Sequence, residues 1–420
     1  MAVPKLRFKG FISDWDSRKF SDTLSFLGTN SFSRDNMNLV SGSVKNIHYG
    51  DILVIYGNVL DTSCEQIPFV NEDVNISKIK EKDYLLSGDV IIADTAEDYT
   101  VGKATEIINS KGIKIIAGLH TQACRPKMKF AVGYLGNFVN SLAFRKQIRR
   151  IAQGTKVLSI IKKYIEDMEI HFPIEKEQQK ISDFLTTFDK RIIAQQNIVA
   201  DLEETKKGLL QKIFSQEIRF KDDNGQDYPD WEEIVLGKCI KFYNGDRSDK
   251  YPKSSEIRNN GIPFINAGDL VDGKVSENKL QYISEKKYKS LGGAKLEVGD
   301  IIYCLRGSIG KNALYDKKYG TLASSLVALR CEKGINNSFL YQIINSEVFV
   351  HKIRIYSTGL AQPNLAASDL KKMKLCIPKR NEQDKIAKFL SSFDKKITAE
   401  KQILSDLQEM KKGLLQQMFV

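Results

Sequence analysis

The sequence lacks long hydrophobic runs and paired cysteines. Its longest apolar stretches, such as DILVIY and GDVIIA, are far shorter than the ~18 residues that a membrane-spanning helix needs. The N-terminal segment MAVPKLRFKG has no apolar stretch of the kind found in secretion signals. Six cysteines are scattered along 420 residues without a CxxC pair, which favours reduced thiols over disulfides or a zinc site. We therefore expect a cytoplasmic protein.

Familiar catalytic motifs are also missing. The segment GSIGKN (Gly307–Asn312) has a Gly-Lys pair but no Ser or Thr after Lys311, so it fails as a phosphate-binding P-loop. No GxGxxG follows an apolar run, and no (Asn/Asp)-Pro-Pro-aromatic quartet of the kind used for adenine methylation is present. The four histidines show no metal-ligand spacing. These absences predict a chain with no catalytic residues and no metal site.

What the sequence does contain is a long internal repeat. The phrase KKGLLQ occurs at Lys206–Gln211 and again at Lys411–Gln416. Aligning Pro173–Phe214 with Pro378–Phe419 needs no gap, and roughly 23 of the 42 positions are identical. Weaker similarity extends upstream, so the order globular–helix–globular–helix reads as a duplicated half-protein.

Each copy of the repeat has the apolar periodicity of a long helix. Apolar positions recur every three or four residues in a heptad-like stripe, and no proline interrupts either copy after its first residue. A helix of about 40 residues spans about 60 Å and cannot bury such a stripe alone. The two copies are predicted to pair with each other, although each could instead pack on its own domain. The stripe positions predicted to pack are Ile181, Phe184, Phe188, Ile198, Leu202, Leu209, Ile386, Phe389, Phe393, Ile403, Leu407 and Leu414.

Each globular half is predicted to be a twisted or barrel-like sheet with helices at its edge. Short β-like runs are punctuated by Gly, Asn and Asp: DILVIYG, GDVIIAD and IKIIAGL in the first half, and IPFINAG, GDIIYCL and SLVALRC in the second. Helices are expected near residues 138–153 and 338–353.

The charge balance points towards a polyanionic partner. The formal net charge is +12, and most of the excess lies outside the two repeated segments. A basic excess on globular parts fits nucleic acid, because neutralising phosphates releases counterions. Simple solubility is the alternative explanation.

Several polar, loop-like positions have the chemistry to contact a DNA duplex. Glycines let backbone N–H groups approach phosphates, Arg can grip guanine or phosphate, and Gln or Asn can pair with adenine. A solvated surface is the alternative for each residue taken singly. The DNA-contact candidates are Lys103, Thr105, His120, Thr121, Gln122, Arg125, Lys127, Arg149, Arg306, Ser308, Lys311, Gln362 and Asn364.

Taken together, the layout resembles the specificity (S) subunit of type I restriction–modification systems. The resemblance rests on the two helices P…EQ.KI..FL..FD to DL…KKGLLQ, the segment GDIIY…RGSIGK, and STGLAQPNL…DLKKMKLCIP before the second helix. It covers essentially the whole chain. The first half departs from it, because it lacks close sequence equivalents of RGSIGK and LAQPN, so Arg306 is left without a counterpart.

The resemblance implies an α+β fold. Two mixed α/β target-recognition domains (residues 1–172 and 216–377) are separated by two long helices (residues 173–215 and 378–420) that pair as an antiparallel coiled coil. Each domain would read half of a split, asymmetric site in double-stranded DNA in a bacterial cytoplasm. The helices would set the gap between half-sites and bind two modification (methyltransferase) subunits.

The same resemblance places the chemistry on other chains. S-adenosylmethionine and adenine-N6 methylation would belong to the modification subunits, and ATP, Mg²⁺ and cleavage to motor (restriction) subunits, with no cofactor in this chain. Two other classes remain open: a stand-alone DNA-binding or coiled-coil adaptor without methyltransferase partners, and an enzyme with an unrecognised site.

Overall fold

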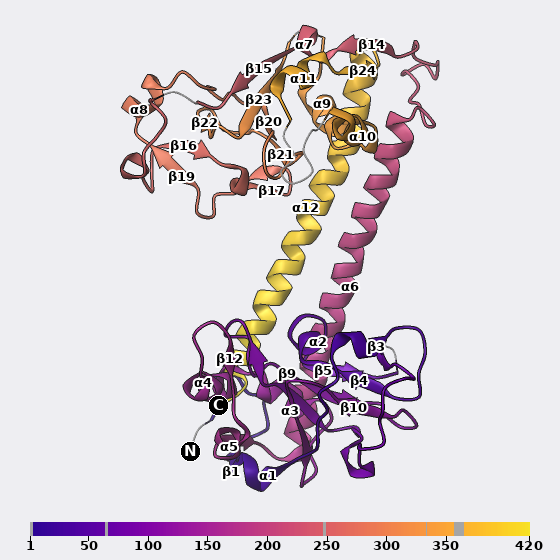
Figure 1. Cartoon of the computed structure of the whole chain (residues 1–420), viewed down its shortest axis with the longest axis vertical. Coiled ribbons are helices and arrows are strands. Elements are labelled where there is room, and N and C mark those ends of the chain that lie inside the picture. The colour runs from indigo at the N-terminus through magenta and orange to yellow at the C-terminus, as the bar shows by residue number, and fades with distance from the viewer. Residues whose placement is uncertain (1–2, 64–65, 247–248, 333, 357–364) are drawn as a thin grey trace. The chain divides into compact units, whose positions relative to one another are not determined.

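The computed structural model describes residues 3–63, 66–246, 249–332, 334–356 and 365–420 (Figure 1). The chain divides into two compact units. Unit 1 is Met1–Asn197 with Gln402–Val420, and unit 2 is Ile198–Lys401. Each unit therefore holds one globular domain together with part of each long helix, α6 (Glu175–Phe214) and α12 (Arg380–Gln417).

Domain 1, the globular part of unit 1, is built on a five-stranded sheet in the order β2-β11-β7-β9-β5, in which only β5 and β9 are parallel. A second sheet has the order β10-β4-β6-β3, while β1 pairs with β13 and β8 with β12. The strands are β1 (Asp16–Lys19), β2 (Leu24–Phe26), β3 (Met37–Asn38), β4 (Lys45–Ile47), β5 (Val59–Asp61), β6 (Phe69–Val70), β7 (Val90–Ala93), β8 (Thr95–Ala96), β9 (Ala104–Ile108), β10 (Ile115–Ala117), β11 (Thr121–Pro126), β12 (Leu158–Ser159) and β13 (Glu169–Phe172). The helices are α1 (Phe20–Thr23), α2 (Tyr49–Val54), α3 (Tyr134–Val139), α4 (Leu142–Ile151) and α5 (Lys162–Glu166), with 3-10 turns η1 (Arg34–Asn36) and η2 (Glu81–Asp83).

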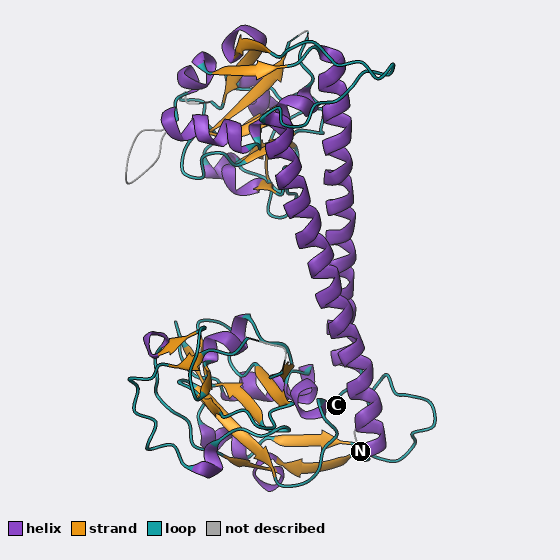
Figure 2. Ribbon diagram, turned by 90° about the vertical axis from the view of Figure 1, so that its right-hand side faces the viewer, coloured by secondary structure: helices purple, strands orange, loops and turns teal. Residues whose placement is uncertain are grey.

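Domain 2, the globular part of unit 2, has an antiparallel four-stranded sheet in the order β15-β23-β20-β21 (orange in Figure 2). A three-stranded sheet β19-β16-β22 and the pairs β14–β24 and β17–β18 complete its strands among the described residues. The strands are β14 (Glu232–Val235), β15 (Ile240–Asn244), β16 (Ile262–Ile265), β17 (Leu270–Val271), β18 (Lys274–Val275), β19 (Gln281–Ile283), β20 (Ile301–Cys304), β21 (Asn312–Leu314), β22 (Thr321–Leu322), β23 (Leu326–Cys331) and β24 (Lys374–Ile377). The helices are α7 (Leu236–Cys239), α8 (Glu285–Ser290), α9 (Asn337–Ile344), α10 (Glu347–Tyr356) and α11 (Ala367–Lys372), with 3-10 turns η3 (Ser254–Glu256) and η4 (Ala267–Asp269).

Each domain completes its apolar core with the end of a long helix. In unit 1 the ring of Phe419, just after α12, lies 6.4 Å from the ring of Trp15 and 6.0 Å from that of Phe138. In unit 2 the ring of Phe214, the last residue of α6, lies 6.2 Å from that of Trp231. Phe214 and Phe419 are equivalent positions of the repeat. Both domains therefore complete their apolar cores with the same residue of the repeated helix.

The start of each domain docks on a helix end in the same way. The Leu6 N–H donates to the Gln417 carbonyl at 2.9 Å in unit 1, where both chain ends lie, and the Ile218 N–H donates to the Lys212 carbonyl at 3.0 Å in unit 2 (Figure 1). The next residues form equivalent ion pairs, Arg7 with the buried Glu177 at 2.7 Å and Arg219 with the buried Glu382 at 2.8 Å. The duplication therefore extends to the junction of domain and helix.

The two long helices pair antiparallel within each unit, as predicted. In unit 1 Lys411 of α12 binds Asp189 of α6, and in unit 2 Lys206 of α6 binds Asp394 of α12 at 2.5 Å. Asp189 and Asp394 are the same repeat position, as are Lys206 and Lys411, so the two contacts are equivalent with the helices exchanged. Within unit 2 a second ion pair joins Lys401 of α12 to Glu203 of α6 at 2.8 Å, so residue numbers rise along one helix as they fall along the other.

Two predicted stripe positions are wrong. Ile198 and Ile403 are 43% and 45% exposed, while their neighbours Val199 and Leu404 are buried and partly buried. The seam, the line of buried residues along each helix, shifts by one residue at this point. An α-helix has 3.6 residues per turn, so positions counted strictly by three and four drift around the helix face. The other predicted positions are buried or partly buried: Ile181, Phe184, Phe188, Leu202, Leu209, Ile386, Phe389, Phe393, Leu407 and Leu414.

Local expectations for the domains are mostly met, with two corrections. The run DILVIYG is not a strand, because α2 occupies most of it and His48 caps that helix by accepting the Gly50 N–H at Nδ1, 3.2 Å away. Short apolar runs do not by themselves distinguish strand from buried helix. Each helix expected near 138–153 and 338–353 is two helices, broken before a capping Ser141 and near Ser346.

Candidate nucleic-acid interface

One end of the main sheet of domain 1 collects several of the predicted DNA-contact residues. Strands β7 and β11 are antiparallel with Ala93 opposite Thr121. The residue after β7 and the residue before β11 therefore meet, and the Asp94 N–H donates to the His120 carbonyl at 3.0 Å. The register of these strands brings together side chains that are about 25 residues apart in sequence.

Four polar side chains at this end form a connected group, the Asp94 cluster (Asp94, Thr95, His120 and Gln122). The Asp94 carboxylate accepts from the Thr95 hydroxyl at 2.9 Å and from the Gln122 amide at 2.7 Å. His120 Nδ1 lies 3.3 Å from the Thr95 hydroxyl oxygen, and the His120 side chain is 48% exposed. Sequence reasoning missed Asp94 and Thr95, although their place directly after the buried run VIIA was a usable signal.

Aromatic rings support the His120 end of this cluster. The ring of Tyr49, at the start of α2, meets the His120 ring edge-on at 5.3 Å and the His48 ring at 4.5 Å. Burial and the nearby Arg34 charge lower the pKa of His48, so this capping imidazole is neutral near pH 7. The rings of Tyr49 and His48 therefore pack beneath the His120 end of the cluster.

A basic helix lies beside the same sheet end. In α4, Arg145 donates to the carbonyls of Val101 and Tyr99, and burial together with the Arg149 charge lowers the Arg145 pKa to about 10. Arg149 is exposed, with its guanidinium carbon 6.0 Å from the Tyr99 ring centre. Lys146 and Arg150 are also exposed. This face carries the positive charge that phosphate contacts require.

The loop after α4 completes the surface. The Ile160 N–H donates to the Asp94 carbonyl at 2.9 Å, and β12 pairs Ser159 with Thr95 of β8. The sheet end, the basic helix and the segment 152–160 are therefore contiguous.

Domain 2 has the same frame with different side chains. The Leu305 N–H donates to the Ser325 carbonyl at 2.9 Å, and the Leu365 N–H to the Leu305 carbonyl at 3.1 Å, which repeat the bonds of Asp94 and Ile160. Thr95 occupies the place equivalent to Arg306. Arg306 thus has no basic counterpart in domain 1, as the sequence indicates when GDVIIADT is aligned with GDIIYCLR.

The loop after β20 in domain 2 is exposed and basic. Arg306, Ser308 and Lys311 are exposed, and Gly307 and Gly310 have φ values of 76° and 89° that disfavour a side chain. The candidates Gln362 and Asn364 lie outside the described residues, although Leu365, next in the chain, is bonded beside this loop.

Three predicted contacts in domain 1 point inward. Thr105 is fully buried and Thr121 is nearly so, with its hydroxyl donating to the Gly118 carbonyl at 2.6 Å. Lys103 donates to the Leu53 carbonyl at 3.0 Å, and burial lowers its pKa. A position inside a sheet is not evident from residue type, and these burials correct the prediction for Thr105 and Thr121.

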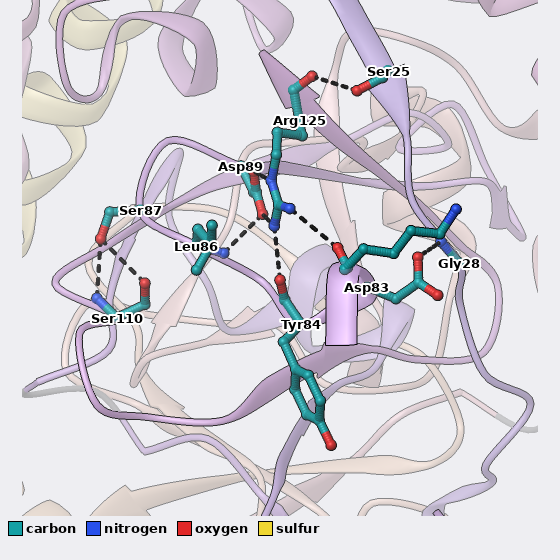
Figure 3. A network of polar contacts seen from close by, with 10 residues as sticks. Ser25, Gly28, Asp83, Tyr84, Leu86, Ser87, Asp89, Ser110 and Arg125 are labelled. Carbon is teal, nitrogen blue, oxygen red and sulfur yellow. Dashed lines mark hydrogen bonds and ion pairs between the residues drawn. The ribbon is translucent and has the colours of Figure 1, made fainter. Parts of the chain in front are cut away.

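Arg125 and Lys127 lie at the opposite end of β11. The Arg125 guanidinium forms two bonds with the buried Asp89, at 3.0 and 2.7 Å, and also donates to the carbonyls of Lys82 and Tyr84 (Figure 3). Lys127 donates to the Ser21 carbonyl at 2.7 Å.

The arrangement of Arg125 recurs in domain 2. Arg330 binds the buried Asp300 at 2.7 Å and the Lys295 carbonyl at 2.8 Å. A pair that occurs at equivalent places in both domains belongs to the shared fold. The structure therefore separates Arg125 from the Asp94 cluster.

Among the described residues, no group of three or more His, Cys, Asp and Glu side chains is placed to hold a metal ion. No helix in the same part of the chain has the length and apolarity to cross a membrane.

Comparison with known proteins gives a family match. The model of the type I restriction modification DNA specificity domain matches residues 41–204 and 228–409. The chain is 26% identical over 276 residues to the type I restriction enzyme MjaVIII specificity subunit of Methanocaldococcus jannaschii, which covers 63% of this chain and 64% of that protein. It is 23% identical over 414 residues to the putative type I restriction enzyme MjaX specificity subunit of the same organism, covering 96% and 92%. The chain thus spans less than two thirds of the first of these relatives.

Solved structures share the fold. The S subunit of a type I restriction–modification system from M. genitalium superposes with a TM-score of 0.58 at 17% identity, over 100% of this chain and 99% of that one. A chain from a structural study of type I restriction–modification complex assembly gives 0.55 at 16% identity over 96% of both. Because the family model matches two regions that together make up most of the chain, the protein belongs to the family of type I restriction–modification DNA specificity domain proteins.

Proposed function

We propose that this chain is the sequence-reading, non-catalytic subunit of a type I restriction–modification complex. Each domain reads one half of a bipartite, asymmetric site in double-stranded DNA, and the two long helices set the gap between the halves. Partner subunits carry out adenine-N6 methylation or ATP-dependent cleavage, and they supply S-adenosylmethionine, ATP and Mg²⁺.

One observation carries the proposal. Equivalent positions at the sheet ends of two like domains hold unlike side chains: Thr95 and His120 in domain 1 correspond to Arg306 and Ser325 in domain 2. Side chains that reach base edges specify sequence, whereas the frame only positions them. Two domains with the same backbone arrangement but different side chains at the sheet end suit a DNA site whose two halves differ in sequence.

The repeated phrase KKGLLQ supports the binding of two like partners. Gly208 and Gly413 lie within α6 and α12, where glycine weakens a helix by roughly 1 kcal/mol. A Cβ added at either would meet nothing within 4 Å among the described residues. Both helices thus carry a destabilising glycine with open space beside it. This arrangement fits a partner that approaches the helix backbone closely, and the proposed partner is one methyltransferase subunit per helix.

Replacing these glycines with alanine tests the partner surface. Gly208→Ala and Gly413→Ala are expected to raise the free energy of unfolding by about 0.5–1 kcal/mol each, because alanine loses less entropy in a helix. The same variants should bind the methyltransferase more weakly on a sizing column. Gln211→Ala, exposed on α6, is the control and should change neither. Unweakened assembly of both glycine variants would remove this surface from the proposal.

Arg306→Ala is expected to change one half-site only. The exposed guanidinium can bind guanine bidentately, and such a contact discriminates by about 1–3 kcal/mol. The methylated motif should lose specificity, or methylation should fall, in the half read by domain 2. A change confined to the other half would reverse the domain assignment.

The role itself is tested by a single-molecule methylome of the source organism with and without the chain. Loss of one bipartite N6-methyladenine motif on deletion is the expected result, and it reveals both half-sites and the gap. An unchanged methylome, with a purified chain that binds DNA but no methyltransferase, would favour a stand-alone DNA-binding adaptor.

A further inference from the structure

We infer that the Asp94 cluster is the base-reading element of domain 1, and that the group it recognises is an exocyclic amine, N6 of adenine or N4 of cytosine, in the major groove. The inference rests on the proposed function and adds to it a residue set and the chemistry of the contact.

Hydrogen-bond accounting places a hydrogen on Nδ1 of His120. A carboxylate only accepts, so the Thr95 hydroxyl must donate to Asp94 across their 2.9 Å contact. That uses the single hydroxyl hydrogen of Thr95. In the 3.3 Å contact between the Thr95 oxygen and His120 Nδ1, the imidazole is therefore the donor. Nδ1 also lies 3.6 Å from Oδ1 of Asp94, so this nitrogen faces the carboxylate.

Gln122 is oriented by the same carboxylate. Its Nε2 donates to Asp94 Oδ2 at 2.7 Å, so its carbonyl oxygen Oε1 must lie on the other side of the amide. That oxygen receives no donor from the described residues. The remaining hydrogen-bonding capacity of the Asp94 and Gln122 side chains is thus dominated by acceptors, the Asp94 carboxylate and Gln122 Oε1.

The negative charge and the acceptor atoms of the cluster determine which chemical groups of DNA it can bind. A carboxylate repels phosphate, so the cluster cannot be a backbone contact. Amines of adenine and cytosine are the donors that base edges present in the major groove. The phosphate contacts that hold domain 1 on the duplex come instead from the exposed cations of the adjacent helix, such as Arg149.

At the equivalent place, domain 2 carries hydrogen-bond donors instead of acceptors. Arg306 replaces Thr95, and Lys311 stands a few residues further on; both side chains only donate. The complementary groups on a base edge are the acceptors N7 and O6 of guanine. The two domains are therefore fitted to unlike halves of a site.

The backbone at His120 points to the same role. His120 has a φ of 54°, in the left-handed region that non-glycine residues seldom occupy. Such strain persists where the surroundings enforce it, frequently at functional sites. The bond from the Asp94 N–H and the Tyr49 ring 5.3 Å away hold the imidazole at the sheet end.

The test is a double-mutant cycle between protein and DNA. The intact complex, assembled with its methyltransferase, is bound to duplexes that carry the motif found in the methylome. Each adenine or cytosine is replaced in turn by purine deoxyriboside or 2-pyrimidinone deoxyriboside, which lack the amine. Asp94→Leu and Gln122→Met are compared with the wild type, and Asp73→Leu, at an exposed carboxylate of the same domain, is the charge-matched control.

Wild type and Asp73→Leu should lose about tenfold or more in affinity at one base of one half-site, in line with the discrimination of a good base contact. Asp94→Leu and Gln122→Met should lose less than about twofold at that base, because their acceptor is gone. The cycle cancels the effect of amine removal on base pairing, since every protein meets the same duplexes.

Two other results would overturn the inference. Equal losses in wild type and both variants, or no amine-sensitive base at all, would show that the cluster does not read an amine even though the bipartite site is real. Absence of any motif that depends on the chain would overturn the proposed function, and the inference with it. Thermal unfolding of both variants separates lost contact from lost folding.

Discussion

Leu390→Asp is expected to unfold unit 2. Leu390 is fully buried on α12, in a cluster with Leu210 and Ile213 of α6 and Phe339 of α9. Removing a buried leucine costs about 2–5 kcal/mol, and burying a carboxylate without a partner adds several more. Because a domain has only about 5–15 kcal/mol of stability, the variant should lose its cooperative transition in urea, followed by circular dichroism.

Ile403→Asp is the matched control on the same helix. Since Ile403 is 45% exposed, a charge there should change the free energy of unfolding by no more than about 0.5 kcal/mol. A sizing column should show the control as a folded chain and Leu390→Asp as aggregate. If the two variants were equally damaged, the seam would pass through Ile403 after all, as the sequence periodicity predicted.

Arg125→Met is expected to destabilise domain 1 by about 3–5 kcal/mol, because it leaves the carboxylate of Asp89 buried without its cation. A companion change Asp89→Leu should restore only part of the loss. The Leu86 N–H also donates to Asp89, at 2.7 Å, and the leucine would remove this acceptor as well. Thermal unfolding of the single and double variants measures both effects.

Arg149→Met is the control for Arg125→Met. Arg149 is exposed, so its loss should leave stability nearly unchanged and weaken DNA binding at low salt. If Arg125 were instead a DNA contact, Arg125→Met would keep its melting temperature and alter one half of the methylated motif. The equivalent Arg330→Met should reproduce the destabilisation in domain 2.

Much of the architecture was predictable because it repeats. A gap-free repeat of more than 40 residues, with apolar spacing of three and four, determines two long helices and their need for a partner. Buried runs such as VIIA and IIYC predict strands, which appear as β7 and β20. These features are local, so periodicity and residue type are enough to specify them.

The placement of the DNA-contact candidates could not be predicted from the sequence, because residue type does not determine where a side chain points. His120 and Gln122 lie in the Asp94 cluster, whereas Arg125, on the same strand, lies at its other end and binds Asp89. Thr105 is buried. Which end of a strand meets which loop depends on the register of strands distant in sequence, and single-sequence patterns carry no register information.

The sequence by itself determined the duplication, the two long helices, the alternation of helix and globular domain, and the family resemblance. Only the tertiary structure decided which residues pack between the helices, which cations bind buried carboxylates, as Arg125 binds Asp89, and which polar side chains gather at Asp94. The physical reason is that periodicity is set by neighbours along the chain. Burial and hydrogen-bond partners are instead set by the pairing of β7 with β11 and of β20 with β23.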